Sequence, residues 1–360
     1  MRKNLFILAA CAALFGMSFT SCSNSDEVVA GAENGVKEAI SFRTPSTRGT
    51  AIAEGSETAM GDFKVWGYYG STVTQTGATA DAIYMGGDAS TGVSVTYADS
   101  KWGYSPLAYW PGDDALNFVA CGPINATEIT GYAASSAEGV ASLTATVAIP
   151  ADVNDQKDIM MGAATASSGT AGLAFKHALS QIQFKAKLAS ADITSAVINS
   201  IQVVNVKGAG TVSYTSAGTP SAAATGDATA SYTLATNVNN DELVDQSTPV
   251  VTSAADAVML SADDGKLMLM PQAITAWDGS SMTEDVPTSG AYIKVNLTIV
   301  AHGTTIFDGD AYAPLGTTWA QGKIYTYTLI CGQNVLSPIQ FSVSSTDWSA
   351  ADPANEDKNF

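Results

Sequence analysis

Apolar residues recur at every second position in several segments of this 360-residue chain, and this pattern constrains its fold more than any other feature. It is clearest in residues 143–149, 182–188, 293–299 and 339–343. A period of two places alternate side chains on opposite faces of an extended strand, one face buried and one in water. No segment carries a sustained helical stripe. The sequence therefore predicts an all-β fold built from half-buried antiparallel strands.

The length of the chain favours two domains over one. Clusters of Gly and Asp separate the predicted strands at short intervals, which is typical of β-sandwiches. The small polar segment 162–172 is the expected linker, so we predict sandwiches at 49–165 and 166–360. Residues 213–256 are rich in Ala, Thr and Ser and are expected to form a long loop.

Composition and missing motifs exclude several classes of function. The formal net charge is 16 − 34 = −18, so the chain lacks the basic face that a nucleic-acid partner requires. It has no HExxH, CxxC, GxSxG or P-loop motif, and a surface hydrolase is the least favoured interpretation. Of its two histidines, His177 is expected to be structural and His302 to lie in an exposed turn. We expect no enzyme activity, no metal and no cofactor.

The N-terminus resembles a secretory signal over residues 1–21. Two basic residues precede an uncharged, mostly apolar run at 5–19, which is too short to span a membrane as a helix. Small residues before Cys22 resemble a bacterial lipobox, in which the cysteine is acylated and becomes the mature N-terminus. The alternative is an ordinary signal peptide with an incidental cysteine. Either interpretation makes residues 22–48 an extracytoplasmic segment.

The remaining cysteines, Cys121 and Cys331, lie at the ends of apolar strands. A disulfide between them would suit an oxidising compartment, but two buried free thiols are the favoured interpretation. Four neighbouring aromatic residues allow a sugar-stacking platform, although their spacing favours roles in the core. These residues are Trp102, Tyr104, Tyr109 and Trp110.

Five strings, in this order, resemble the fimbrillin family, the pilus subunits of Bacteroides-type bacteria. They are YWP followed by LNFVA at 109–120, DIMMG at 158–162, LAFKHALS at 173–180, LMPQ at 269–272 and GKIYTYTL at 322–329. The resemblance implies two tandem transthyretin-like β-sandwiches. It also implies a lipidated precursor at the outer membrane, removal of an N-terminal segment by an arginine-specific protease, and assembly on the cell surface with other copies or related subunits.

Arginine is placed where this assembly requires it. The chain has only three arginines, Arg2, Arg43 and Arg48, and none in the 312 residues from Gly49 onward. The loop around Arg48 contains Pro, Ser, Thr and Gly, as exposed and cleavable loops do. Cleavage after Arg48, or alternatively after Arg43, releases a short strand that includes Ile40 and Phe42. General avoidance of arginine is the simpler alternative, but it leaves the close spacing of Arg43 and Arg48 unexplained.

The alternating segment with Ile339, Phe341 and Val343 is the candidate donor strand for the next subunit. Alternation does not say whose sheet a strand joins, so this segment equally suits the closing strand of its own domain. We expect a pilus shaft subunit. A tip adhesin, an anchor subunit and a surface glycan-binding lipoprotein remain alternatives, with a host or bacterial surface ligand as a further partner.

Overall fold

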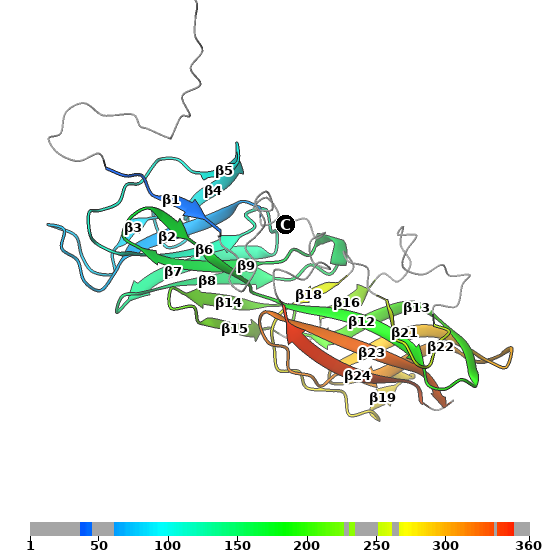
Figure 1. Cartoon of the computed structure of the whole chain (residues 1–360). Helices are drawn as coiled ribbons and strands as arrows, with labels where there is room; N and C mark the ends of the chain where they lie inside the picture. Colours follow the sequence, from blue (N-terminus) through cyan, green and yellow to red (C-terminus); the bar gives the residue numbers. More distant parts are fainter. Residues whose placement is uncertain are drawn as a thin grey trace, which may run out of the picture. The chain divides into compact units, whose positions relative to one another are not determined.

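The computed structural model describes residues 37–44, 61–226, 230–234, 251–260, 266–334 and 337–348. This part of the chain is nearly all β, with one short 3₁₀ turn at Val153–Asp155 (Figure 1). No helix within it is long and apolar enough to cross a membrane. The predicted all-β class is confirmed.

The first sheet has seven strands in the order β11-β9-β6-β2-β4-β5, with β3 beside β2. Its central strand β6 is buried along its whole length, because apolar residues occupy both of its faces. Phe118 points to one face and Val119 to the other. The strands are β2 (Phe63–Tyr69), β3 (Ile83–Met85), β4 (Val93–Ala98), β5 (Lys101–Gly103), β6 (Leu116–Gly122), β9 (Met160–Ala166) and β11 (Ala174–His177).

A second sheet, in the order β15-β14-β8-β7, packs on one face of the first. Strand β8 shows the predicted alternation, with Leu143, Ala145 and Val147 buried in the shared core. The strands are β7 (Ile129–Ala137), β8 (Val140–Ala148), β14 (Ala209–Thr215) and β15 (Pro220–Thr225). These two sheets form one sandwich.

The third and fourth sheets enclose the largest core. Their orders are β17-β12-β23-β24, with β18 beside β12, and β16-β13-β21-β22. The pairing of β12 with β23 is parallel, whereas their neighbours pair antiparallel. The strands are β12 (Ser180–Leu188), β13 (Ile193–Val206), β16 (Ala230–Leu234), β17 (Val258–Met259), β18 (Leu267–Leu269), β21 (Tyr292–Ala301), β22 (Thr304–Pro314), β23 (Lys323–Asn334) and β24 (Ser337–Asp347), with a small hairpin of β19 (Met282–Thr283) and β20 (Val286–Pro287).

The linker expected at residues 162–172 is wrong. The segment contains β9, which pairs with β6, and β10 (Thr170–Gly172). Its small residues serve close packing: a Cβ on Gly162 would lie 2.9 Å from the ring of Phe175. The loop expected at 213–256 is also partly wrong, because it contains all of β15 and β16, and Tyr232 and Leu234 of β16 are buried.

A separate core covers the outer face of the first sheet, away from the second sheet. Phe63, Phe118 and Phe175 form its floor. The floor is covered in part by β1 (Ser41–Arg43), drawn above β2 and β6 in Figure 1, and by β10, with which β1 pairs in parallel. The segment with the predicted removable strand therefore covers apolar surface of the first sheet.

Candidate functional site: the seat of residues 38–44

Residues 38–44 form an extended segment with hydrogen-bonded neighbours on both sides, β1 (residues 41–43) pairing on one side and residues 38–40 on the other. On one side β1 runs parallel to β10, with Ser41 opposite Thr170. On the other side the Ile40 N–H donates to the Ala108 carbonyl at 2.9 Å, and the Trp110 N–H donates to the Glu38 carbonyl at 3.0 Å. We call the surface between residues 108–110 and 170–173, with its apolar floor, the β1 seat.

The inward side chains of this strand fill the β1 seat. Ile40 and Phe42 are 2% and 5% exposed. The Phe42 ring centroid lies 5.5 Å from that of Phe118, 5.6 Å from that of Tyr104 and 6.3 Å from that of Phe63. Two of these contacts are edge-to-face, the arrangement that aromatic pairs favour. The alternation of Ile40 and Phe42 thus places both side chains in the core that covers the first sheet.

Thr44 occupies a third inward position and is 6% exposed. Its hydroxyl is buried and has no hydrogen-bond partner among the described residues. A buried hydroxyl without a partner loses its hydration and gains nothing in exchange. The third position of the β1 seat therefore suits an apolar side chain better than the threonine that fills it.

Tyr104 ties the strand to the loop before β6. Its phenol donates a hydrogen bond to the Ile40 carbonyl at 2.8 Å. Burial raises the pKa of Tyr104, so the phenol remains protonated and able to donate. Trp110 is buried and donates from its indole to the Gly169 carbonyl at 3.0 Å. These two residues of the aromatic cluster serve packing and positioning, as the sequence predicted.

The processing residues of the sequence prediction are placed only in part. Arg43 lies at the end of β1 with its side chain exposed. Cys22, Arg48 and Gly49 lie outside the described residues. Ile40 and Phe42, predicted as one removable strand, lie together in the β1 seat.

The candidate donor strand lies in the second sandwich as β24, an edge strand paired antiparallel with β23. Only the first of its three predicted anchors is well buried. Ile339 is 3% exposed, Phe341 is half-buried, and Val343 is 46% exposed. In this structure β24 completes its own sheet, and most of the strand faces solvent.

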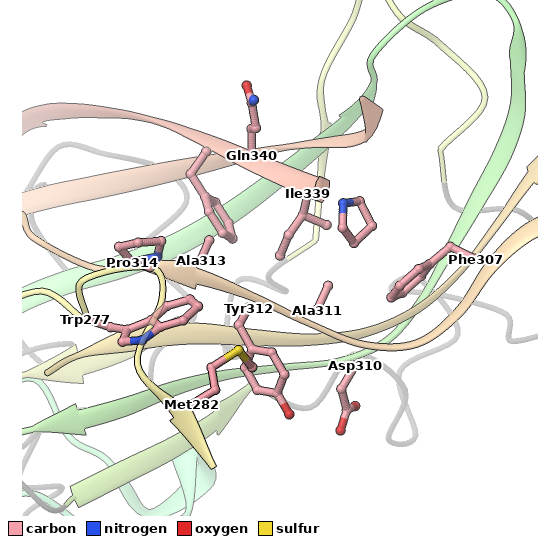
Figure 2. A pocket seen from close by; sticks show the side chains of 13 residues that line it. Trp277, Met282, Phe307, Asp310, Ala311, Tyr312, Ala313, Pro314, Ile339 and Gln340 are labelled. Carbon is pink, nitrogen blue, oxygen red and sulfur yellow. The ribbon is translucent and has the colours of Figure 1, made fainter. Parts of the chain in front are cut away.

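A cavity of about 620 Å³ lies between β24 and β22, the edge strands of the two sheets. Figure 2 shows Ile339 pointing toward the cavity and Gln340 pointing away from it. Trp277, Met282 and Phe307 line it from the other elements. The second sandwich is therefore open along this edge, between β24 and β22.

The end of β24 is held by Trp348, the residue that follows it. The Trp348 indole stacks on His177 with 3.9 Å between ring centroids and 3° between ring planes. His177 is in turn hydrogen-bonded to Asp158 at 2.6 Å. Trp348 packs in the core of the first sandwich, whereas Ile339 packs in that of the second. His177 is structural, as predicted, and His302 is exposed in the turn between β21 and β22.

The described residues contain no cluster of three or more potential metal ligands. Cys121 and Cys331 are free thiols buried in different cores, and burial raises the pKa of each to about 12. The favoured interpretation of these cysteines is therefore confirmed over the disulfide.

Sequence reasoning missed both flanks of the β1 seat, residues 108–110 and 170–173, and the third side chain that fills it, Thr44. The flanking segments carry no local signal, since strand patterning does not identify the neighbouring strand. Thr44 could have been found, because it continues the alternation of Ile40 and Phe42 by one step.

Comparison with known proteins identifies the family. A search of curated protein sequences finds no match. In the solved structures, the chain is similar to a fimbrial protein from Bacteroides vulgatus, with a TM-score of 0.58 and 17% identity over 87% of this chain and 99% of that one. It is also similar to a candidate cell adhesion protein from Bacteroides uniformis, with a TM-score of 0.45 and 16% identity over 87% and 98% of the two chains.

The first of these likenesses shows a shared fold. The family model described as fimbrillin-like matches residues 50–348, which is most of the sequence. The chain therefore belongs to the fimbrillin-like family.

Proposed function

We propose that this protein is a structural subunit of a cell-surface pilus that polymerises by exchange of a β-strand. Membership of the fimbrillin-like family supports the pilus role and the location at the cell surface. In this proposal the chain is exported as a lipoprotein of the outer membrane, acylated at Cys22. An arginine-specific protease then cleaves it after Arg48, or alternatively after Arg43. The two sandwiches are its two domains, but the bounds predicted from sequence at residues 165 and 166 do not separate them, because β11, β14 and β15 belong to the first sandwich. No catalytic role is assigned.

The observation that carries this proposal is the central position of residues 38–44. Because the strand is bonded on both sides, its removal leaves two unpaired backbone edges and an uncovered aromatic floor. Such edges accept a strand from another chain. A donated strand restores the hydrogen bonds and the apolar cover together, as in the donor-strand complementation known for pilins.

The geometry of the exchange gives a filament. The acceptor surface lies on the first sheet, whereas β24 belongs to the second sandwich. Donor and acceptor are thus different surfaces of one chain, and a head-to-tail contact of this kind produces an open polymer when it does not close on itself. Exposed edge strand β24 is the candidate donor, because it can leave its sheet without breaking pairing on its other side.

Substituting Arg48 tests the processing step. Arg48→Lys is expected to stop an arginine-specific protease from producing the Gly49 terminus, and so to keep the purified precursor monomeric. The matched control, Arg43→Lys, should still be cleaved and polymerise. Mass spectrometry identifies the N-terminus, and negative-stain microscopy detects polymers. Polymers whose subunits still begin at an acylated Cys22 would contradict the shaft role and favour an anchor.

A further inference from the structure

Two segments far apart in the chain carry the same pattern of side chains. Residues 40–44 read Ile-Ser-Phe-Arg-Thr, and residues 339–343 read Ile-Gln-Phe-Ser-Val. The first, third and fifth positions are the inward ones in the β1 seat, where they are filled by Ile40, Phe42 and Thr44. The two intervening residues, Ser41 and Arg43, are exposed. The match therefore falls on the positions that contact the core.

We propose that Ile339, Phe341 and Val343 of a second copy of this chain replace Ile40, Phe42 and Thr44, residue for residue. This register rests on the strand exchange proposed above and specifies its partner and its geometry. The acceptor seat and the donor strand are thereby matched within one sequence, so the chain recognises copies of itself.

The phenylalanine position favours this transfer. In its own sandwich Phe341 is half-buried, with one aromatic neighbour among the described rings, Tyr327 at 6.4 Å. The position of Phe42 offers three aromatic rings within that distance and nearly complete burial. Moving the ring from one environment to the other removes more apolar surface from water.

The third position makes the donor a better occupant than the strand it replaces. Thr44 buries a hydroxyl that has no partner among the described residues. Val343 has the same branched shape with a methyl group in place of that hydroxyl, and it is 46% exposed in its own sandwich. Placing Val343 at this position buries an exposed apolar side chain and removes an unsatisfied polar group.

The backbone supports the same register. Pro338 precedes Ile339 and falls on the position of Ala39. A proline has no N–H to donate. The described hydrogen bonds between this strand and residues 108–110 use the Ile40 N–H and the Glu38 carbonyl, and none uses the Ala39 N–H. Moving the register by two residues would place Pro338 opposite Thr170, inside the parallel pairing, where a missing N–H interrupts the ladder.

Cysteine cross-linking reads the register directly. The Ser41 hydroxyl lies 2.8 Å from that of Thr170, so the register places Gln340 of the donor beside Thr170 of the acceptor. After cleavage and assembly, oxidised Gln340→Cys/Thr170→Cys protein should give a ladder of covalent oligomers on a non-reducing gel. Pro338→Cys/Thr170→Cys and Ser342→Cys/Thr170→Cys protein should not. Expression from Ser23 leaves only the buried Cys121 and Cys331 as other thiols.

The outcomes distinguish an error in the proposed register from an error in the proposed strand exchange. Polymers that cross-link through the 338/170 or 342/170 pair, or through no pair, overturn the register while strand exchange stands. Failure of the cleaved, unsubstituted protein to polymerise overturns the proposed function instead.

Val343→Thr tests the third position independently. It restores the unsatisfied hydroxyl and should raise the protein concentration needed for half-maximal polymerisation about tenfold. The outward-facing control Ser342→Thr should leave that concentration unchanged. Equal behaviour of the two variants would overturn the placement of Val343 at the position of Thr44.

Discussion

Replacing Phe42 by alanine is expected to lower the free energy of unfolding of the uncleaved precursor by about 3 to 5 kcal/mol. The phenylalanine is 5% exposed and its ring packs against those of Phe63, Tyr104 and Phe118. Its removal leaves a cavity between β1 and the first sheet, which those rigid rings cannot fill by collapsing. Urea unfolding followed by tryptophan fluorescence measures the change.

The neighbouring residue Arg43 provides a matched control. Its side chain is exposed on the opposite side of the same strand, so Arg43→Ala should change the free energy of unfolding by less than about 0.5 kcal/mol. A loss at Phe42 no larger than that at Arg43 would mean that the strand does not stabilise the first sheet. Its removal would then create no acceptor.

Replacing both Ile339 and Phe341 by alanine is expected to abolish polymerisation of the cleaved protein. Each truncation removes roughly 2 to 5 kcal/mol of packing where the side chain is fully buried. The two together lower the affinity of a donor for the β1 seat by at least a thousandfold. Sedimentation and negative-stain microscopy of cleaved protein measure the loss. The outward-facing pair Gln340→Ala/Ser342→Ala should polymerise normally.

A mixing experiment separates a lost donor from a damaged fold. The Ile339→Ala/Phe341→Ala protein keeps an intact β1 seat, so after cleavage it should still accept β24 from an unsubstituted subunit. Added in small amounts, it should shorten the polymers by ending them. Deletion of residues 337–360 should also abolish assembly, but it removes the Trp348 contact with His177 as well, so the point variants test the strand more specifically. Polymers of normal length from the doubly substituted protein would rule out β24 as the donor.

Strands with one buried face were predictable from sequence, because their alternation has a single physical cause. β12, β21 and β24 cover the predicted alternating segments, and β8 covers all of 143–149 except Ile149. The error at 162–172 has an equally specific cause. Small residues in β9 resemble a linker in composition, yet they are small because aromatic rings such as that of Phe175 lie directly against the backbone. Composition cannot distinguish these two uses of glycine and alanine.

At the candidate site too, the local pattern of the sequence predicted a strand but not the segments that lie beside it. The pattern of Ile40 and Phe42 predicted a strand, which the structure shows as β1 and the residues before it. Release of this strand by cleavage after Arg48 stays a prediction. The neighbours of that strand come from residues 108–110 and 170–173, which are more than 60 positions away in sequence. Only the folded structure brings them together around residues 38–44. Only the structure shows that the Thr44 hydroxyl is buried there without a hydrogen-bond partner among the described residues.

A reversible disulfide between β1 and β10 tests most directly whether residues 38–44 must leave the β1 seat before the protein assembles. Because the Ser41 and Thr170 hydroxyls lie 2.8 Å apart, Ser41→Cys/Thr170→Cys should form a disulfide that holds residues 38–44 in the β1 seat even after cleavage at Arg48. The oxidised, cleaved protein is expected to stay monomeric and to polymerise once a reductant releases the strand. Polymerisation that proceeds equally well with the disulfide intact would contradict the account, because the β1 seat would then play no part in assembly.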